Sequence, residues 1–417
     1  MSLESEKPPR GRFLHSVRDV YPPFRVDLTV LFSKEIIRHG WSIDWHMRNE
    51  AKSGPYTHVV SPQERVFLSR GGGKEKNGSI INNINFVAHD IRLVFLILKG
   101  NYTFVQVMDD TLAAVLGLFS ARIKGLPFIY WMSFPFCMVD VDKATDKDLE
   151  ISSFHRLAYF LRGKLCSAVL YRLVLPRANH IFVQSEQMKR DLAAIGIAEE
   201  KMTAVPMGID LEMLTISGNK QDVIDPRVHG KRMLLYLGTM PRARRIEFLV
   251  DVLALVVDRF ENVILVLVGD APPSDMAYLR RYVELSGMKD RVVFTGFIPR
   301  ERAWDYVRRA DVCLSPFRPI PILNSTSPTK IVEYMALGRP VVANNTPDQD
   351  SLLRESGAGY SVPYTERDFA EAVIGLLEDP VRAEEMGKRG QAYIQKTRSY
   401  RVIGDKVNEV YESLIRK

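Results

Sequence analysis

The chain alternates short apolar segments with amphipathic ones along most of its length. Apolar runs at 11–17, 41–47 and 126–132 have the length of buried strands. The segment 26–40, between the first two runs, has apolar residues at helical spacing and ends on a glycine, which suits a helix C-terminus. Alternation of this kind predicts parallel strands joined by helices.

Two polar breaks interrupt this pattern. The stretch 48–80 is polar and rich in glycine, so we expect a mobile loop there. The stretch 213–232 falls near the middle and predicts an interdomain linker. After it come near-continuous runs of Val, Leu, Ile and Phe, as expected for parallel strands covered on both faces.

The predicted fold class is therefore α/β, with two Rossmann-like, doubly wound parallel-sheet domains facing across a cleft. We expect the first domain at 1–212, the linker at 213–232 and the second domain at 233–395. The remaining residues, 396–417, have the spacing of one further helix.

Composition agrees with a globular protein and limits its location. Of 417 residues, 46% are hydrophobic and 26% charged, enough for a sizeable core. The three cysteines form no C-x-x-C pair, which favours a reducing compartment over a disulfide framework or zinc site. No secretory signal or run of about 20 apolar residues is apparent; the longest candidate, 125–139, holds two prolines and suits a buried strand with its exit loop. We expect a cytoplasmic protein, soluble or peripheral on the cytoplasmic membrane face.

The net charge of +7 is most concentrated in segment 151–185, which holds arginines and lysines but no acidic residue. A basic amphipathic stretch can lie on an anionic bilayer, with apolar side chains below a ring of cations. The alternative is an ordinary helix packed on the first sheet. Nucleic acid also suits a basic patch, but no nucleic-acid module is recognisable, so we expect no such partner.

The sequence "NSTSPTKIVEYM" predicts an anion site. Ser327 suits a helix N-cap, and Pro328 suits the first helical position. The amides of Thr329 and Lys330 would then face an anion, most often phosphate. Glu333 lies about one turn further along, within reach of a sugar hydroxyl. The alternative is a capped helix with a surface glutamate.

Other candidates follow predicted strands, where parallel sheets bind ligands. The loop "TMPRARR" begins after Gly238 and supplies Arg242, Arg244 and Arg245. Arginines there can hold a diphosphate by bidentate hydrogen bonds. Gly269 ends the next strand and leaves room for close approach of a ligand. A solvated basic loop is the alternative for the arginines.

Four blocks in order resemble the C-terminal domain of GT-B glycosyltransferases of retaining family 4. They are "RANHIFVQSEQMKRDLAAIGIAEEKMTAVPMGIDLEML", "LYLGTMPRARRIEFLVDVLA", "RVVFTGFIPRERAWDYVRRADVCLSPF" and "SPTKIVEYMALGRPVVAN". The likeness covers most of the chain and is strongest from 178 to 380. It implies a GT-B fold, an acceptor-binding first domain and a nucleotide-sugar-binding second domain. It also implies that the final helix crosses back to the first domain.

The resemblance assigns roles to individual residues. Arg244 falls on the family's lysine and would neutralise the donor diphosphate, with Lys330 beside it. Glu333 falls on the second glutamate of the family's E-x7-E pair and would bind the ribose hydroxyls. Thr239 stands where the family has an arginine, and Arg242 is the candidate replacement.

Ser325 replaces the first glutamate of that pair, so it offers the sugar a hydroxyl but no charge. The turn 296–299 would meet the base, with Phe297 and Ile298 as neighbours. The complete predicted site comprises Gly238, Thr239, Arg242, Arg244, Gly269, Phe297, Ile298, Ser325, Thr326, Ser327, Pro328, Thr329, Lys330 and Glu333.

The first half departs further from the family. "YPPFRV" replaces its glycine pair, and Ser133 and Phe134 occupy the region where a histidine often lies. We therefore name no catalytic base there. The resemblance implies that the departing phosphate oxygen takes the acceptor's proton and that no metal is required. We expect Asp109 and Asp110 to bind the acceptor or cap a helix.

The sequence thus predicts a retaining glycosyltransferase acting on a nucleoside-diphosphate sugar and a carbohydrate or lipid-linked acceptor, without a cofactor. A nucleotide-sugar epimerase on the same fold is one alternative, but we identify no acid and histidine set for proton abstraction. A non-catalytic partner subunit is another. Ser325 and Thr239 favour it, whereas Arg244, Lys330 and Glu333 argue against it.

Overall fold

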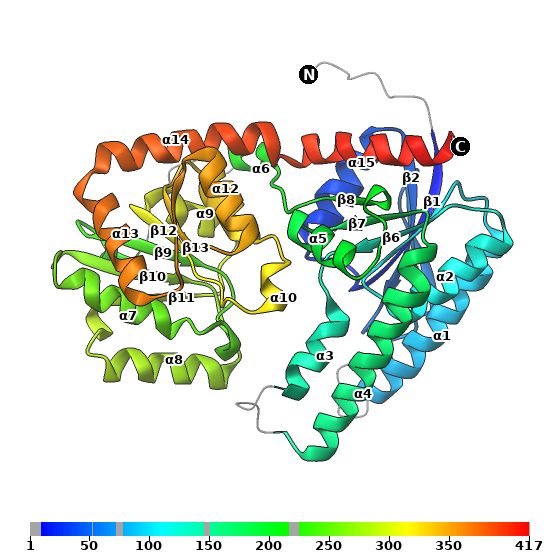
Figure 1. Ribbon diagram of the computed structural model, residues 1–417, viewed down its shortest axis with the longest axis horizontal. Helices are drawn as coiled ribbons and strands as arrows, with labels where there is room; N and C mark the ends of the chain where they lie inside the picture. The colour runs from blue at the N-terminus through cyan, green and yellow to red at the C-terminus, as the bar shows by residue number, and fades with distance from the viewer. Residues whose placement is uncertain (1–9, 52, 72–77, 146–150, 217–224, 417) are drawn as a thin grey trace. The chain divides into compact units, whose positions relative to one another are not determined.

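The computed structural model describes residues 10–51, 53–71, 78–145, 151–216 and 225–416, which form two compact units (Figure 1). Unit 1 comprises Met1–Pro206 with Tyr400–Lys417, and unit 2 comprises Met207–Ser399. Each unit is built around its own β-sheet with helices on both faces.

Unit 1 contains an eight-stranded sheet of order β3-β4-β2-β1-β5-β6-β7-β8. All neighbours are parallel except the antiparallel pair β3–β4. The strands are β1 (Gly11–Val20), β2 (Trp41–Arg48), β3 (Tyr56–Ser61), β4 (Glu64–Leu68), β5 (Val105–Met108), β6 (Phe128–Met132), β7 (His180–Val183) and β8 (Met202–Ala204).

The helices of unit 1 cover both faces of this sheet. They are η1 (Asp27–Ile36), α1 (Gly78–Lys99), α2 (Thr111–Ile123), α3 (Phe136–Thr145), α4 (Ser153–Val169), η2 (Leu170–Val174), η3 (Leu175–Arg177), α5 (Glu186–Ala194), η4 (Glu199–Lys201) and α15 (Tyr400–Ile415). The last helix packs into the unit 1 core. The Tyr411 hydroxyl donates to Gln106 at 2.7 Å, and Trp41 Nε1 donates to Asn408 at 3.0 Å.

Unit 2 contains a six-stranded parallel sheet of order β11-β10-β9-β12-β13-β14. The strands are β9 (Arg232–Leu237), β10 (Val263–Val268), β11 (Val292–Gly296), β12 (Val312–Ser315), β13 (Val341–Asn344) and β14 (Gly359–Val362). Alternate strand residues pack into two separate hydrophobic clusters, one on each face. The continuous apolar runs in the sequence have this cause, because both faces of the strands are buried.

The helices of unit 2 are α6 (Leu211–Ile216), η5 (Pro226–Val228), η6 (Arg242–Arg244), α7 (Glu247–Val257), α8 (Pro273–Leu285), η7 (Lys289–Arg291), α9 (Arg300–Arg309), α10 (Pro321–Asn324), α11 (Thr329–Ala336), α12 (Pro347–Ser356), α13 (Glu366–Glu378) and α14 (Pro380–Thr397). Two of them, α6 and η5, fall partly or wholly in the predicted linker 213–232. The linker residues 217–224 lie outside the described residues.

The expectation of a mobile loop at 48–80 is wrong over most of the segment that the structure describes. Strands β3 and β4 form a hairpin there, and β4 extends the sheet beside β2. Val66 and Leu68 are buried, while Arg65 binds Asp44 at 2.9 and 2.5 Å. An ion pair between the half-exposed Arg65 and the buried Asp44 therefore lies within the strand pattern, which makes the sequence of this strand look polar. Residues 52 and 72–77 lie outside the description.

The segment 125–139 is also corrected in part. Strand β6 is buried, as predicted, but its exit is short because α3 begins at Phe136. Helix α1 is a longer apolar element that the sequence reasoning did not single out. Its window Ile81–Lys99 has the length and composition of a membrane span, although 28% of that window is buried in the fold.

Candidate functional site

The candidate site lies in unit 2, at the carboxyl ends of its central strands. Three glycines with positive φ end or follow these strands: Gly238 (φ 146°), Gly269 (φ 134°) and Gly296 (φ 68°). A Cβ on Gly269 would lie 2.2 Å from the carbonyl oxygen of Gly238, so the two turns touch. Any side chain at Gly269 would push the two turns apart. The carboxyl ends of β9 and β10 therefore expose backbone without side chains here.

Two cationic side chains meet at a tyrosine hydroxyl on this edge. Nη1 of Arg244 lies 3.3 Å from the hydroxyl of Tyr236, and Nζ of Lys330 lies 3.2 Å from it. The Tyr236 hydroxyl itself donates a hydrogen bond of 3.1 Å to the carbonyl of Thr239. Strand β9, helix η6 and helix α11 thus contribute one residue each to a compact cationic centre, the Arg244–Lys330 centre.

Lys330 is held in this position by aromatic rings. Its Nζ lies 4.5 Å from the ring centroid of Tyr236 and 4.8 Å from that of Phe317, within cation–π range. The side chain is only 7% exposed, and this burial lowers the pKa of Lys330. Burial opposes ionisation of Tyr236, but Lys330 and Arg244 outweigh it and lower the pKa of the Tyr236 hydroxyl. The centre as a whole therefore favours a negatively charged neighbour.

The N-terminus of α11 lies at the same centre, but it begins differently from the prediction. The helix starts at Thr329, and Pro328 is its N-cap residue, so Ser327 is not the N-cap and Pro328 is not the first helical residue. Proline offers no side-chain acceptor for the first amides. The Ser327 hydroxyl instead donates to Asp348 at 2.7 Å and accepts from the amide of Met207 at 3.1 Å. Because no side chain caps the helix, its first amides keep their capacity to bind an anion.

Glu333 lies one turn into α11, on the same helix as Lys330. Its Oε1 accepts a hydrogen bond of 3.3 Å from Nε1 of Trp304 in α9. Burial raises the pKa of Glu333, while Arg300, the Trp304 hydrogen bond and Lys330 pull it down in part. The carboxylate is a partly buried acceptor at the edge of the cationic centre.

The hydroxyl-rich turn before α11 is packed. Ser325 is 7% exposed and Thr326 is 9% exposed. The hydroxyl of Thr326 donates to the carbonyl of Leu323 at 2.7 Å, which fixes the turn after α10. The packed turn therefore fixes the position at which α11 begins.

Some predicted residues lie away from the Arg244–Lys330 centre. Arg242 turns toward α8, with its guanidinium 4.4 Å from the ring centroid of Tyr278 and its amide bonded to Asp275 at 3.1 Å. Phe297 is 81% exposed, and Ile298 packs against a core cluster of unit 2.

Sequence reasoning also missed residues that contact Lys330 and Glu333. Tyr236 and Phe317 both contact Lys330, and Trp304 binds Glu333. Tyr236 sits inside the run "MLLYLG", where an aromatic residue suggests only core. The usable signal was its position two residues before Gly238, at the ligand-binding end of the strand.

Family comparisons agree with both units. Residues 231–379 match the model described as "Glycosyl transferases group 1", and residues 51–213 match "Glycosyltransferase Family 4". The chain belongs to glycosyltransferase family 4. The resemblance of its sequence motifs to this family is thereby confirmed.

Curated relatives of this family 4 chain match over about half of their length. Phosphatidyl-myo-inositol mannosyltransferase of Mycobacterium leprae (strain TN) is 28% identical over 212 residues, covering 50% of this chain and 53% of the relative. Alpha-D-kanosaminyltransferase of Streptomyces kanamyceticus is 25% identical over 183 residues, covering 44% and 46%.

Solved structures share the fold over nearly the whole chain. Sucrose-phosphate synthase from Thermosynechococcus elongatus has a TM-score of 0.72 at 19% identity and covers 97% of this chain and 99% of its own. Anabaena HepE in complex with UDP-glucose has a TM-score of 0.67 at 16% identity and covers 97% and 100%. The predicted GT-B fold, with two Rossmann-like parallel-sheet domains, is confirmed.

Unit 1 of this family 4 chain has a polar cluster at the ends of its own strands. Asp109 has a positive φ of 57° and accepts from the amide of Ser133 at 2.9 Å. Its carboxylate also lies 3.4 Å from Arg25, which is bound to Asp27. Burial raises the pKa of Asp109 to about 6, against the opposing effect of Arg25.

Asp110 caps a helix, one of the two roles expected for the Asp109–Asp110 pair. Its carboxylate accepts from the amide of Ala113 at 3.1 Å at the start of α2, and it pairs with Arg48 at 2.5 Å. Of the pair, Asp109 is the residue whose backbone conformation is uncommon for a non-glycine residue.

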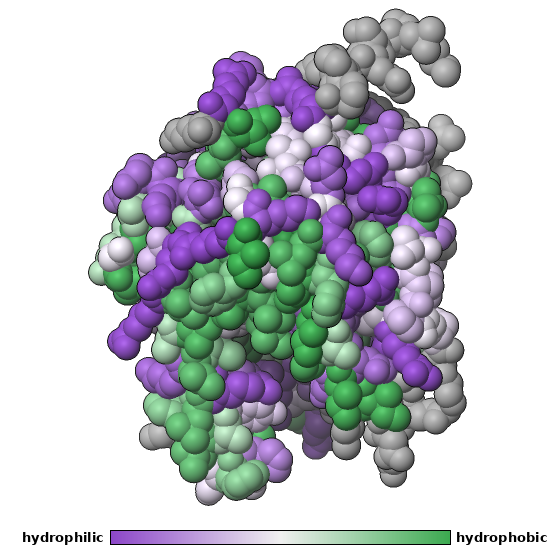
Figure 2. Space-filling view, turned by 90° about the vertical axis from the view of Figure 1, so that its right-hand side faces the viewer, coloured by the Kyte–Doolittle hydropathy of each residue, from purple (hydrophilic) through white to green (hydrophobic). Residues whose placement is uncertain are grey.

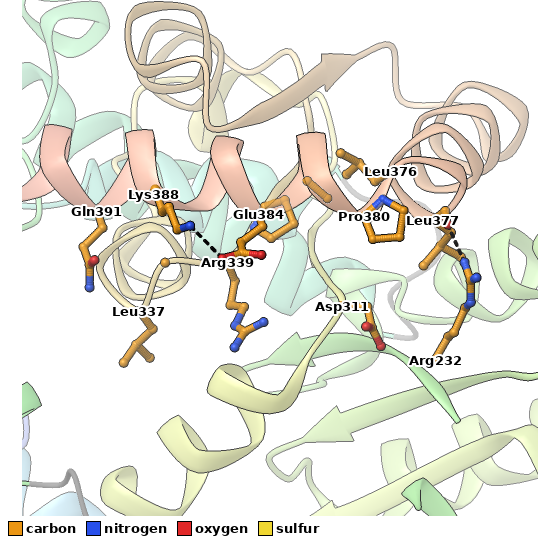
Figure 3. Close-up of a pocket in the computed structure, with 13 residues that line it drawn as sticks. Arg232, Asp311, Leu337, Arg339, Leu376, Leu377, Pro380, Glu384, Lys388 and Gln391 are labelled. Atoms are coloured by element: carbon orange, nitrogen blue, oxygen red, sulfur yellow. Dashed lines mark hydrogen bonds and ion pairs between the residues drawn. The ribbon is translucent and has the colours of Figure 1, made fainter. Parts of the chain in front are cut away.

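A pocket of about 620 Å³ lies in unit 2 at the amino ends of the strands, opposite to the candidate site (Figure 3). Its lining includes residues at the starts of β9, β12 and β13. Charged side chains there are engaged within the fold: Lys388 pairs with Glu384 at 2.7 Å, and Asp311 accepts from the amide of Met233 at 2.6 Å. This pocket is distinct from the site at the carboxyl ends of the strands.

Proposed function

We propose that this protein transfers a sugar from a nucleoside-diphosphate donor to an acceptor hydroxyl, with retention of the anomeric configuration. The observation that carries the proposal is the convergence of Arg244 and Lys330 beside the uncapped N-terminus of α11. Two cations and free helix amides together suit a diphosphate, which carries at least two negative charges. Stabilising that charge as it develops on the leaving group is the main way such a site lowers the barrier.

In the proposed step, the bond between the anomeric carbon and the diphosphate oxygen breaks. A new bond forms between that carbon and the acceptor oxygen on the same face of the sugar. The acceptor's proton passes to the departing phosphate oxygen. Arg244 and Lys330 hold the diphosphate throughout, and Glu333 binds the ribose hydroxyls and orients the nucleoside.

The names of similar proteins support a hexosyl donor. HepE was solved with UDP-glucose, and the mycobacterial relative is a mannosyltransferase. We propose a carbohydrate or lipid-linked acceptor, bound by unit 1 near the strand-end cluster around Asp109. The proposed location is the cytoplasm, with peripheral binding to the membrane face.

In the basic segment 151–185, some arginines bind other groups of unit 1, so fewer are available to a membrane than the sequence indicated. Arg162 is bound to Asp140 at 2.7 and 2.6 Å, and Arg156 donates to the carbonyl of Ala144 at 3.2 Å. The segment's exposed cations include Lys164, Arg172 and Arg177. We therefore propose that apolar side chains of this segment contribute to membrane binding together with its exposed cations.

The proposal is tested by incubating the purified protein with UDP-, GDP- and ADP-sugars, without acceptor. We expect saturable binding of one donor and slow release of its nucleoside diphosphate. Absence of binding across the panel would instead support the non-catalytic partner subunit, which Ser325 in place of a glutamate favours. Interconversion of the donor sugar without release of the diphosphate would indicate an epimerase.

A further inference from the structure

Helix α1 presents an almost purely apolar face to solvent. Six of its large hydrophobic side chains are between 39% and 64% exposed, at spacings of three or four residues that place them along one stripe. The stripe is about 25 Å long at the rise of an α-helix. It consists of Ile81, Ile84, Val87, Ile91, Phe95 and Leu98.

Two further helices of unit 1, α2 and α4, also carry exposed apolar side chains. Lys124, just after α2, donates to the carbonyls of Ile97 and Leu98 at 3.1 and 2.9 Å, which ties α2 to the end of α1. Helix α4 runs on into η2, whose Leu170 and Val174 pack in the core cluster shared with α2. The exposed members on these helices are Leu112, Phe119, Ile123, Phe154, Leu157, Phe160, Leu161 and Leu165.

Together these residues form the α1–α2–α4 surface. Six lie on α1, three on α2 and five on α4, out of 27 exposed large hydrophobic side chains in the part of the chain that is described. Figure 2 looks onto the side of unit 1 where Figure 1 draws α1 and α2, and hydrophobic side chains gather there in a broad field. Concentration of this kind marks an interaction site, whereas scattered exposed apolar residues do not.

The charges on this surface have one sign. Asp90 is the single acidic residue within 78–99, 111–124 and 153–169, and it is buried. The exposed cations include Lys99, Arg122 and Lys164. Exposed apolar side chains and cations, with no exposed carboxylate on these three helices, complement an anionic bilayer, which offers hydrocarbon below a negative surface.

The inward side of α1 argues against a transmembrane role for this helix. His89 and Asp90 are buried there, and His89 stacks on His46 of β2 with ring centroids 3.7 Å apart. Leu93 and Ile97 belong to the core of unit 1. A span would have to withdraw these side chains from the fold, so α1 is suited to lie in the plane of a membrane.

We propose that the α1–α2–α4 surface docks unit 1 onto an anionic bilayer, with the α1 stripe immersed at the level of the acyl chains. This inference rests on the proposed function, because it places the acceptor-binding unit at a membrane where a lipid-linked acceptor would reside. A second copy of the chain is the less suitable occupant, because self-association would bring its cations together.

The test is flotation of the full chain with vesicles, in the absence of any donor sugar. We expect binding to vesicles of phosphatidylcholine with 30% phosphatidylglycerol and at least tenfold weaker binding to phosphatidylcholine alone. Changing Ile84, Ile91 and Phe95 together to Gln should reduce binding at least tenfold. Because all three side chains are exposed, thermal unfolding should be almost unchanged.

Two further variants complete the test. The control changes three apolar residues elsewhere that are at least half exposed, Ile195, Leu285 and Val381, to Gln and should bind like the wild type. Changing Lys99, Lys164 and Arg172 to Gln should remove the preference for anionic vesicles.

Equal flotation of the α1 variant and the wild type would overturn the proposal, as would failure of the wild type to float. A lipid-independent dimer that the α1 variant abolishes would also overturn it, by showing self-association. Donor hydrolysis is measured without vesicles, so loss of one result leaves the other interpretable.

Discussion

At the scale of single residues, the cationic centre makes Lys330 the most consequential side chain of the proposed site. It is buried between two aromatic rings and shares the Tyr236 hydroxyl with Arg244. Replacing Lys330 with Met keeps much of the apolar stem and removes the charge. We expect the dissociation constant for the donor to rise at least about 30-fold, since removing one partner of a buried charge pair costs 2 kcal/mol or more.

Arg244→Ala should have a smaller effect, about tenfold, because the arginine is more exposed than Lys330. The control is Arg367→Ala, which removes a solvent-exposed arginine on α13. Calorimetric titration of each variant gives the comparison. Unchanged donor affinity in both site variants would contradict the assignment of the diphosphate to this centre.

Glu333 has a separate test because its proposed partner is the ribose. Glu333→Ala should weaken donor binding about tenfold through loss of charge-assisted hydrogen bonds. The wild type should also bind a 2′,3′-dideoxy nucleotide more weakly than the ribonucleotide. The variant should not distinguish the two nucleotides. If the variant retains the full preference for ribose, the hydroxyls are bound elsewhere.

The residue scale is also where sequence reasoning was least complete. Arg244, Lys330 and Glu333 could be placed because they stand in ordered motifs beside strand ends. The role of Ser327 was wrong because its hydroxyl bonds to Asp348 and Met207, which are distant in sequence. Tyr236 was missed because an aromatic residue in an apolar run suggests core, and only its position two residues before Gly238 indicates a place near the site.

At the scale of elements, the packing of α1 on β2 depends on uncharged histidines. Burial lowers the pKa of His46 to about 3 and that of His89 to about 2. These groups are neutral in the fold but take up protons near pH 6.5 when unfolded. Their contribution to stability is therefore complete above pH 6.5 and is lost as the pH falls toward the folded values.

His89→Phe should keep a ring against His46 and remove one of these protonation sites. Between pH 7 and pH 5, the free energy of unfolding of this variant should rise relative to wild type by roughly 2 kcal/mol. Urea unfolding at several pH values measures it, with His229→Phe as an exposed control. A difference independent of pH would show that His89 does not remain neutral in the folded unit.

The elements themselves could be predicted well where burial dominates. Strands such as β9 and β10 are continuous apolar runs, because both faces of their sheet are covered. The β3–β4 hairpin was missed because β3 is largely exposed and β4 carries Arg65, whose charge is compensated by Asp44 in another strand. Helix α1 was passed over because its apolar residues serve two faces, one in the core and one exposed.

At the scale of the whole molecule, two Rossmann-like units divide the proposed work. Unit 2 brings its strand ends, η6 and α11 to one cationic centre, whereas unit 1 carries the buried Asp109 cluster and the α1–α2–α4 surface. The fold of two Rossmann-like parallel-sheet domains could be predicted from alternating strand and helix patterns. The polar hydrogen-bond partners and exposed faces depend on tertiary packing, so the sequence showed them only in part.

The central claim is that the Arg244–Lys330 centre binds the diphosphate of the donor. Hydrogen–deuterium exchange of the full chain, with and without the best-binding nucleoside diphosphate, tests it most directly. We predict slower exchange in 238–245 and 328–334, with little change at the starts of β9 and β13 that line the pocket in Figure 3. Protection confined to that pocket, or to unit 1, would contradict the account.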